Sequence, residues 1–302
     1  MKSKILIAGA TGLIGRELVK ECLKEGIDIH YLTTSKKKIE QKLGYQGFYW
    51  DPSNNIIDIA AFNGVTAIIN LAGASVAKRW TASNKEEILQ SRTQTTTLIY
   101  TTLKRINHSV LHYITASGVS VYPSSLEHLY AEKNPLIAET FLGKVVMAWE
   151  EAADKFLDLN IRVAKVRTGI VLSNTGGALS KMVPPIKWGV GAALGTGEQW
   201  QSWIHIKDLI RIYLYLLHNE LSGIFNAVSP NPVTNKKMTQ VIANHYNKSL
   251  WLPNIPAFVL KMILGSMANI TLESQLVSSQ KLVEMGFQFQ FVNLENAIED
   301  VL

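Results

Sequence analysis

Short apolar runs alternate with amphipathic stretches through the first half of the chain. Runs of strand length lie at Lys4–Ala8, Ile27–Thr33, Phe48–Trp50, Val65–Ala72, Val110–Ala116 and Ile161–Thr168. Stretches with helical spacing lie between them at Gly12–Glu25, Asn84–Arg105 and Glu139–Asp158. This alternation predicts βαβ units, because a crossover helix returns the chain to the same end of a sheet. We therefore expect an α/β fold with a doubly wound parallel sheet.

The pattern changes after Gly169. Residues 173–202 are rich in Gly and Pro and lack strong periodicity, whereas His205–Asn219 predicts a helix and Gly223–Val228 a further strand. We expect residues 1–171 to form the sheet domain, with residues 203–228 returning to it. Residues 172–202 and 229–302 would form a smaller, mainly helical substrate domain.

A glycine-rich turn follows the first strand. Gly9, Gly12 and Gly15 form a G-x-x-G-x-x-G pattern that opens a helix. Gly9 allows the tight turn, Gly12 lets a pyrophosphate approach the backbone, and Gly15 lets helix and sheet pack closely. Free amides and the positive end of the helix dipole would then meet the phosphates. The turn predicts a bound nucleotide, and a glycine-rich turn without a ligand is the alternative.

The tip of the second strand indicates which dinucleotide is bound. NAD-specific proteins usually carry an acidic residue there for the ribose 2′-hydroxyl. Asp28 comes too early in the strand, and the tip offers Thr33, Thr34, Ser35 and Lys36. Hydroxyls and cations favour a 2′-phosphate, so we predict NADP(H) over NAD. Lysines that only face water are the alternative.

Composition and charge limit the partners. The formal net charge of +6 favours anionic ligands, but no basic stripe interleaved with aromatic residues is present. The most apolar region, residues 250–264, is broken by Pro253, Pro256 and Lys261 and is shorter than the ~20 residues of a bilayer span. We therefore expect a small-molecule substrate and neither nucleic acid nor a membrane as partner. The oligomeric state stays open.

The single cysteine, Cys22, excludes a disulfide within the chain and suits a reducing compartment. The charged start enters a glycine turn at once, unlike a signal peptide, so a cytoplasmic location is expected. The seven histidines are scattered without HExxH or HxE spacing, and no metal site is predicted.

Several segments together resemble a known family. These are AGATGLIG, INLAG, LAGASVAKRWT, SRTQTT, AWEEAA, FNAVSPNPVTN and the long block from RTGIVLSNTGG to WIHIKDL. They are similar to the extended short-chain dehydrogenases/reductases and, more narrowly, to their sugar-nucleotide-epimerase-like subfamily. The resemblance covers residue 3 to about residue 300. It implies a Rossmann domain that binds NADP(H), a C-terminal domain of the DUF1731 type, and an oxidoreductase or epimerase acting on a small or nucleotide-linked substrate.

The resemblance also implies which residues contact the cofactor. They are Gly9, Thr11, Gly12, Leu13, Ile14, Gly15, Thr34, Ser35, Leu71, Ala72, Glu87, Arg92 and Val171. The family commonly has Ser-Arg where this chain has Thr34-Ser35, and Lys36 could replace the arginine. The guanidinium of Arg92 could clamp a phosphate or pair with Glu87, and a plain surface ion pair is the alternative.

The catalytic groups depart from the family pattern. Extended reductases place a Ser or Thr at the end of the fifth strand and a Tyr-x-x-x-Lys on the next helix. Here Thr140 stands four residues before Lys144, and Gly118 occupies the hydroxyl position, with Ser117 one place earlier. The subfamily generally lacks this dyad.

Substitutes for the dyad can still be named. Ser117, Tyr122 and Lys144 are the candidates, with packing as the alternative for Tyr122 and exposure to solvent for Lys144. A non-catalytic NADP(H)-binding or redox-sensing module is the second functional hypothesis.

The glycine-rich block after residue 169 could form a substrate wall over the sheet edge. It carries Lys181, Lys187 and three tryptophans. His205 and Asp208 begin a predicted helix, where capping and packing between domains are favoured over a role in the site.

Overall fold

The computed structural model describes residues 3–302. Within these residues, nine strands form one twisted sheet in the order β13-β9-β7-β6-β1-β2-β4-β3, with β5 paired to β4. The strands are β1 (Lys4–Ala8), β2 (Asp28–Thr33), β3 (Gln41–Lys42), β4 (Tyr45–Asp51), β5 (Ile56–Ile57), β6 (Ala67–Asn70), β7 (His112–Gly118), β9 (Arg162–Thr168) and β13 (Gly223–Ala227). All pairs are parallel except those of β3 and β5 with β4.

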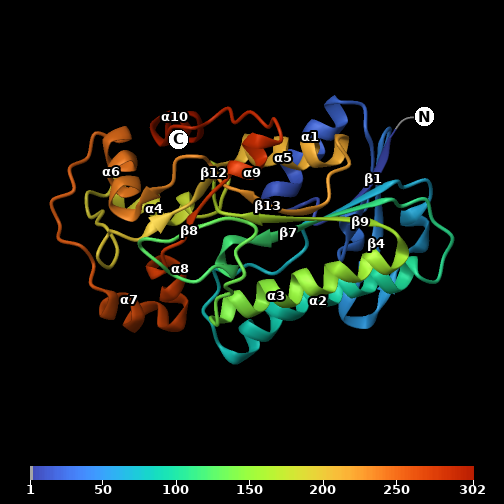
Figure 1. Cartoon of the computed structure of the whole chain (residues 1–302), viewed down its shortest axis with the longest axis horizontal. Coiled ribbons are helices and arrows are strands. Elements are labelled where there is room, and N and C mark those ends of the chain that lie inside the picture. Colours follow the sequence, from blue (N-terminus) through green and yellow to red (C-terminus); the bar gives the residue numbers. More distant parts are fainter. Residues whose placement is uncertain (1–2) are drawn as a thin grey trace.

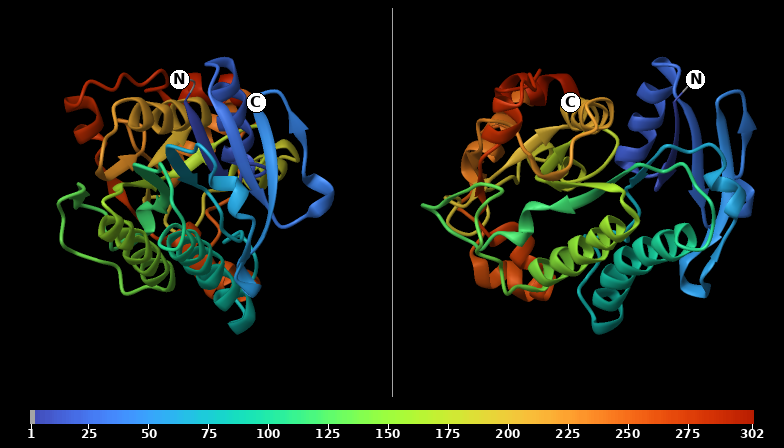
Figure 2. Two further views of the ribbon diagram at one scale, coloured as in Figure 1. Left: turned by 90° about the vertical axis from the view of Figure 1, so that its right-hand side faces the viewer. Right: turned by 45° about the vertical axis from the view of Figure 1, so that its right-hand side comes forward.

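Helices cover both faces of this sheet, as Figure 2 shows. Helices α1 (Leu13–Lys24) and α5 (Ile206–His218) share one core with β1 and β2, which includes Leu18, Cys22 and Leu209. Helices α2 (Ala82–Leu103) and α3 (Phe141–Asp154) lie against the other face, with short 3-10 turns at several strand and helix ends. Burial raises the pKa of the Cys22 thiol to about 12, so this residue is a packing group.

A second lobe lies at one end of the sheet, at the left of Figure 1. It contains α4 (Leu179–Lys187), α6 (Asn235–His245), α7 (Ala257–Leu264), α8 (Asn269–Leu272) and α10 (Leu294–Val301). Helix α9 (Gln280–Glu284) instead packs through Leu282 against the core of the large sheet. Small two-stranded sheets join it to the large one: β10 (Ile170–Leu172) with β12 (Trp203–His205), β11 (Trp200–Gln201) with β14 (Val233–Thr234), and β8 (Leu129–Tyr130) with β15 (Leu276–Val277). No helix within residues 3–302 is both long and apolar enough to cross a membrane.

The predicted doubly wound fold is confirmed, and its element boundaries have local causes. The helix predicted over Glu139–Asp158 begins at Phe141, because the Thr140 hydroxyl caps it by accepting from the Gly143 amide at 3.2 Å. The strand predicted over Val65–Ala72 ends at Asn70. Helix α4 was not expected, since Gly and Pro obscured its periodicity in residues 173–202.

Candidate functional site

The glycine turn lies where the carboxyl end of β1 enters α1. Gly9 has a φ of 85°, and a Cβ built on it would lie 2.8 Å from the carbonyl carbon of Leu71. A Cβ on Gly15 would overlap the carbonyl oxygen of Gly9. Gly12 is exposed and hydrogen-bonds through its amide to the Gly9 carbonyl at 3.0 Å. The turn therefore needs glycine for its conformation and its close contacts, and it leaves the amides at the start of α1 open.

The parallel register brings three chain segments to this edge. Ala8 pairs with Leu32 on one side and with Asn70 on the other, so β1, β2 and β6 end side by side. Beyond β2, Thr34 is exposed and the Ser35 amide donates to the Thr33 hydroxyl at 3.2 Å. Lys36, Lys37 and Lys38 form an exposed 3-10 turn directly after Ser35. Hydroxyls and cations thus remain at the strand tip, whereas Asp28 lies at the far end of β2.

The segment after β6 is held rigidly beside Gly9. The Asn70 side chain donates to the Tyr113 hydroxyl at 2.8 Å and accepts from the Ala72 amide at 3.1 Å. These bonds fix Leu71 and Ala72, which are half-buried and open to the edge. Val171 reaches the same region, because Gly177 packs between its carbonyl oxygen and the side chain of Leu13.

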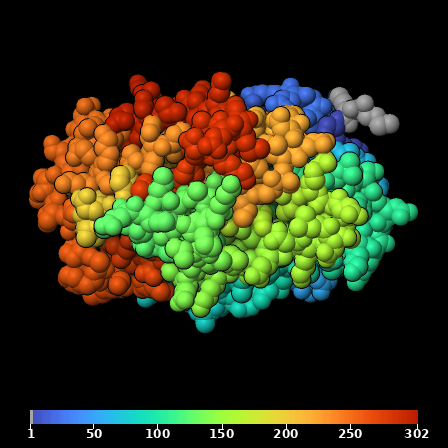
Figure 3. Space-filling model, viewed as in Figure 1, coloured from blue at the N-terminus to red at the C-terminus, as the bar shows by residue number. Residues whose placement is uncertain are grey.

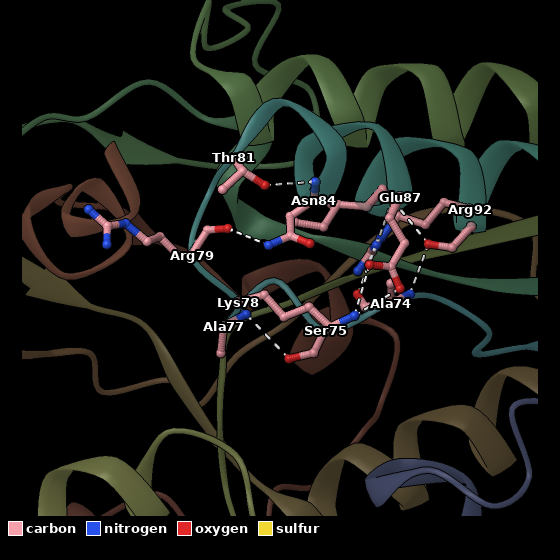
Figure 4. A network of polar contacts seen from close by, with 11 residues as sticks. Ala74, Ser75, Ala77, Lys78, Arg79, Thr81, Asn84, Glu87 and Arg92 are labelled. Atoms are coloured by element: carbon pink, nitrogen blue, oxygen red, sulfur yellow. Dashed lines mark hydrogen bonds and ion pairs between the residues drawn. The ribbon is translucent and has the colours of Figure 1, made fainter. Parts of the chain in front are cut away.

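Arg92 is a cation on α2 whose hydrogen bonds go only to backbone carbonyl groups. Its Nη1 donates to the carbonyl oxygen of Ala74 at 3.1 Å (Figure 4) and to that of Ile88 at 2.8 Å. Its guanidinium lies 5.1 Å from the ring centre of Trp149. Within residues 3–302 no carboxylate forms an ion pair with it, and burial lowers the pKa of Arg92 to about 10. A buried guanidinium paired only with carbonyls favours binding of an anion.

Glu87 does not pair with Arg92. Both of its carboxylate oxygens accept from Lys78 at 2.8 Å, in an exposed pair that also appears in Figure 4. The alternative of an Arg92–Glu87 ion pair is therefore wrong, and the two residues are separate groups on α2.

A cavity of about 250 Å³ opens at the carboxyl ends of β7 and β9. Its walls come from both lobes: Val76, Arg92, Ser117, Gly118, Val119, Ser120, Leu142, Val145, Val146, Trp149, Thr168, Gly169, Ile170, Trp200, Gln201, Ser202, Ile270, Glu273 and Gln275. The α3 wall is apolar, and the polar groups come from Arg92 on α2, the strand ends and the second lobe. This mixture fits a small, partly apolar molecule with a few polar substituents.

The face that α3 turns to the cavity differs from the sequence-based expectation. Leu142 and Val146, four residues apart, line the cavity. Lys144 is exposed and is not among the lining residues, and Thr140 is the helix cap. The i, i+4 pair that faces the cavity is thus apolar, so α3 offers neither a hydroxyl nor an ammonium to a substrate.

Ser117 and Tyr122 belong to a buried polar network. The Ser117 hydroxyl donates to Glu150 at 2.5 Å, and Glu150 accepts two bonds of 2.8 Å from Arg167. Arg167 also donates to the Tyr122 hydroxyl at 3.0 Å, and Tyr122 donates to Asn226 at 2.8 Å. Ser117 still lines the cavity, but Tyr122 is fully buried and does not. The Tyr122 hydroxyl is therefore not available to a substrate. Tyr122 is a packing residue, which was the alternative to a catalytic role.

Sequence reasoning missed Ser120 and Glu273. A Cβ on Gly118 would lie 3.4 Å from the Ser120 hydroxyl, so Ser120 places an oxygen near the side-chain position that Gly118 leaves empty. The sequence signal that could have identified Ser120 is that it follows Gly118 by only two residues. Glu273 enters from the second lobe, and burial raises its pKa while Gln275 partly opposes the shift. No local pattern placed Glu273 here.

The glycine-rich block contributes only part of the expected wall. Trp200, Gln201 and Ser202 line the cavity, whereas Lys181 and Lys187 are exposed and lie outside it. His205 caps α5 by accepting from the Lys207 amide at 3.1 Å, as predicted. The Asp208 carboxylate is buried and accepts from the backbone amides of Gln290 and Phe291. Among the described residues no cluster of His, Cys, Asp and Glu could hold a metal ion.

The fold agrees with comparisons to known proteins. A model of the NAD dependent epimerase/dehydratase family matches residues 5–228. The chain belongs to this family. The C-terminal part of this family member matches a domain of unknown function, DUF1731, over residues 255–301. Both matches confirm the resemblance that the sequence segments indicated.

Relatives of this family member cover its whole length. An epimerase family protein of Staphylococcus aureus is 36% identical over 301 residues, which is 98% of each chain. The human epimerase family protein SDR39U1, crystallised with NADPH, is 28% identical with a TM-score of 0.84, covering 99% of this chain and 98% of that one. A nucleoside-diphosphate sugar epimerase of Corynebacterium glutamicum is 28% identical with a TM-score of 0.79, over 100% of this chain and 58% of that one.

Proposed function

We propose that this protein binds NADP(H) along the carboxyl edge of the large sheet and acts on a small substrate in the adjoining cavity, as an oxidoreductase or epimerase. The observation that carries the proposal is the cavity at the ends of β7 and β9, on the sheet edge where the glycine turn leaves its amides open. The dinucleotide would supply or accept a hydride. The chain's own residues would bind, orient and handle protons.

The residues present fit a dinucleotide with a 2′-phosphate. The amides of Thr11, Leu13, Ile14 and Gly15 suit the pyrophosphate, and Leu71, Ala72 and Val171 would flank it. Thr34, Ser35 and Lys36 offer hydroxyls and a cation, with no acidic residue at the strand tip. The NADPH in the human relative supports this choice over NAD. The lone cysteine supports a reducing, cytoplasmic location.

Three groups in the cavity would handle protons in place of the missing tyrosine. The Ser117 hydroxyl donates to Glu150, and its free lone pairs can accept from a substrate hydroxyl, so Ser117 can relay a substrate proton toward Glu150. Ser120 and Glu273 also line the cavity, and the raised pKa of Glu273 suits a proton donor. Arg92 would hold an anionic group of cofactor or substrate.

Cofactor choice is tested by titrating the purified protein with NADPH and NADH and following nicotinamide fluorescence. NADPH should bind at least about tenfold more tightly. Ser35→Asp should reverse this preference, because a carboxylate repels the 2′-phosphate and accepts from a 2′-hydroxyl. Ser109→Asp adds the same charge on an exposed loop before β7 and should change nothing. Absence of binding to either dinucleotide at millimolar concentration would overturn the proposal.

Turnover is tested by following NADPH absorbance across a panel of aldehydes, ketones and nucleotide sugars. For whichever compound of the panel is turned over with NADPH, Ser120→Ala and Glu273→Gln should each slow the reaction by about 10²-fold or more. Lys144→Ala, on the exposed side of α3, is the matched control and should keep full activity.

A second function, a non-catalytic NADP(H)-binding or redox-sensing module, has one observation in its favour. The cavity-facing pair on α3 is Leu142 and Val146, so the usual proton donor has no counterpart there. Tight NADPH binding without turnover of any member of the panel would favour this module over the enzyme.

A further inference from the structure

Two segments of the second lobe carry lysines and no acidic residue. Residues 174–197 and 229–272 contain no Asp or Glu and six exposed lysines: Lys181, Lys187, Lys236, Lys237, Lys248 and Lys261. Without these six, the 30 basic residues of the chain would fall to 24 and balance its 24 acidic residues. Within residues 3–302 only Lys237 among the six has an ion-pair partner, Glu295. These two segments thus carry a formal charge of +6, whereas Glu198 and residues 273–302 add six acidic residues and one lysine.

The same lobe exposes large apolar side chains, which we call the apolar patch. Its members are exposed by 64 to 78% and are Trp188, Trp251, Phe258, Met262 and Ile263. The Trp251 indole donates to the Gly189 carbonyl at 2.9 Å, which places the turn after α4 against the segment before α7. Ile255 pairs with Leu194, so α7 starts beside the same turn. Figure 3 shows this end of the molecule in orange and yellow at the left.

Helix α7 has little contact with the protein interior. Only Leu260 of its eight residues is buried, while Phe258, Met262 and Ile263 face solvent together with Lys261. Lys187 lies 4.4 Å from the ring centre of Tyr246, and Lys248 follows two residues later. Lys187, Lys248 and Lys261 thus lie within three residues of a member of the apolar patch along the chain. Exposed aromatic and aliphatic groups of this size mark an interaction surface.

We propose that the apolar patch and its lysines dock on the surface of an anionic lipid bilayer. Tryptophan rings are suited to the headgroup level, and long lysine side chains can reach lipid phosphates while their stems cover apolar surface. A second copy of the chain is a poor occupant, because a two-fold contact would set the same lysines against each other. Contact is peripheral and does not span the bilayer. This proposal differs from the expectation of no membrane partner, which stays a prediction that the experiment below tests.

The test is co-sedimentation of the full chain with vesicles of phosphatidylcholine alone and with about 30% phosphatidylglycerol, at low salt and at about 0.5 M salt. Binding should require the anionic lipid, weaken with salt and shift the emission of the exposed tryptophans to shorter wavelength. The triple variant Lys187→Ala, Lys248→Ala, Lys261→Ala should bind roughly 100-fold more weakly, about fivefold for each lysine.

A second triple variant, Trp188→Ser, Phe258→Ser, Met262→Ser, should weaken binding more than about tenfold. Ile59→Ser with Leu157→Ser is the matched control, since these side chains are similarly exposed on the sheet domain. NADPH titration of every variant reports that each is folded.

Three results would overturn the proposal. The first is that the protein does not bind anionic vesicles at low salt. The second is that both triple variants bind as well as wild type. The third is that the protein binds no vesicles and light scattering shows a dimer that the second triple variant dissociates.

Discussion

Gly15 faces Gly9 across the first βα turn at a distance that leaves no room for a methyl group. A Cβ there would overlap the Gly9 carbonyl oxygen and lie 2.8 Å from the Ala10 Cα. Gly15→Ala should therefore move α1 away from β1, destabilise the protein by about 1–3 kcal/mol and weaken NADPH binding more than about tenfold. Nicotinamide fluorescence and urea unfolding measure both effects.

Gly26→Ala is the control for that variant. Gly26 has a positive φ of 75° but nothing lies within 4 Å of its missing Cβ. This variant should cost about 1 kcal/mol of stability through backbone strain alone and keep full cofactor affinity. Equal loss of affinity in both variants would show that the close contact at Gly15 does not shape the turn.

Glu273 allows a prediction about pH that needs no substrate. Burial raises its pKa, so above its ordinary value of 4.5 the folded state holds more protons than the unfolded state. Stability linked to this group is full below that value and falls as the pH rises through the raised pKa. Glu273→Gln should therefore increase the melting temperature at pH 7.5 relative to wild type, and this gain should vanish near pH 4.

The matched control for Glu273 is Glu198→Gln, which alters an exposed carboxylate. A gain for Glu273→Gln that is independent of pH would contradict the assignment, because it would point to packing instead of ionisation.

Helix α3 is tied to β9 by two ion pairs that should differ in strength. Glu150 and Arg167 are almost fully buried, with side-chain exposures of 4 and 7%, whereas Asp154, paired with Lys165 one turn later, is 47% exposed. Glu150→Ala leaves a buried guanidinium without its partner and should cost about 3–5 kcal/mol. Asp154→Ala should cost less than about 1 kcal/mol, because water screens that pair. Urea unfolding compares the two variants, and equal costs would contradict the difference in burial.

Helices and strands with a clear periodicity of apolar residues could be predicted from the sequence. Features that depend on contacts between distant residues could not. The strands and helices of the sheet domain follow from alternating apolar runs, and the glycine turn follows from its spacing. The face of α3 could not be read in this way, because Thr140-x-x-x-Lys144 has the local spacing of the family dyad. The Glu150–Arg167 pair fixes the rotation of the helix and turns Leu142 and Val146 to the cavity.

The cavity is a property of the whole molecule, since its lining residues span positions 76 to 275. Local patterns located Arg92 and Ser117, which lie near recognisable segments. They could not locate Glu273 or Gln275, which reach the cavity because β15 pairs with β8 and Ser274 is bonded to Ser125. Such long-range contacts leave no periodic signal, so the second half of the site needed coordinates.

The same coupling between lobes predicts how the cofactor acts on the second lobe. Gly176 and Gly177 pack on the Leu13 side chain in the glycine turn, and α4 begins two residues later at Leu179. Phosphates bound at the amides of the turn would fix Leu13 and, through it, this segment. NADPH at about 100 times its Kd should therefore slow amide hydrogen exchange in residues 174–182 by up to about 100-fold. Exchange in α7, which lies away from Leu13, should stay unchanged. Protection confined to the sheet domain would show that the two lobes respond independently. The Leu13→Ala variant should still bind NADPH but lose protection in residues 174–182 alone. That result would identify the contact with Leu13 as the link between the lobes.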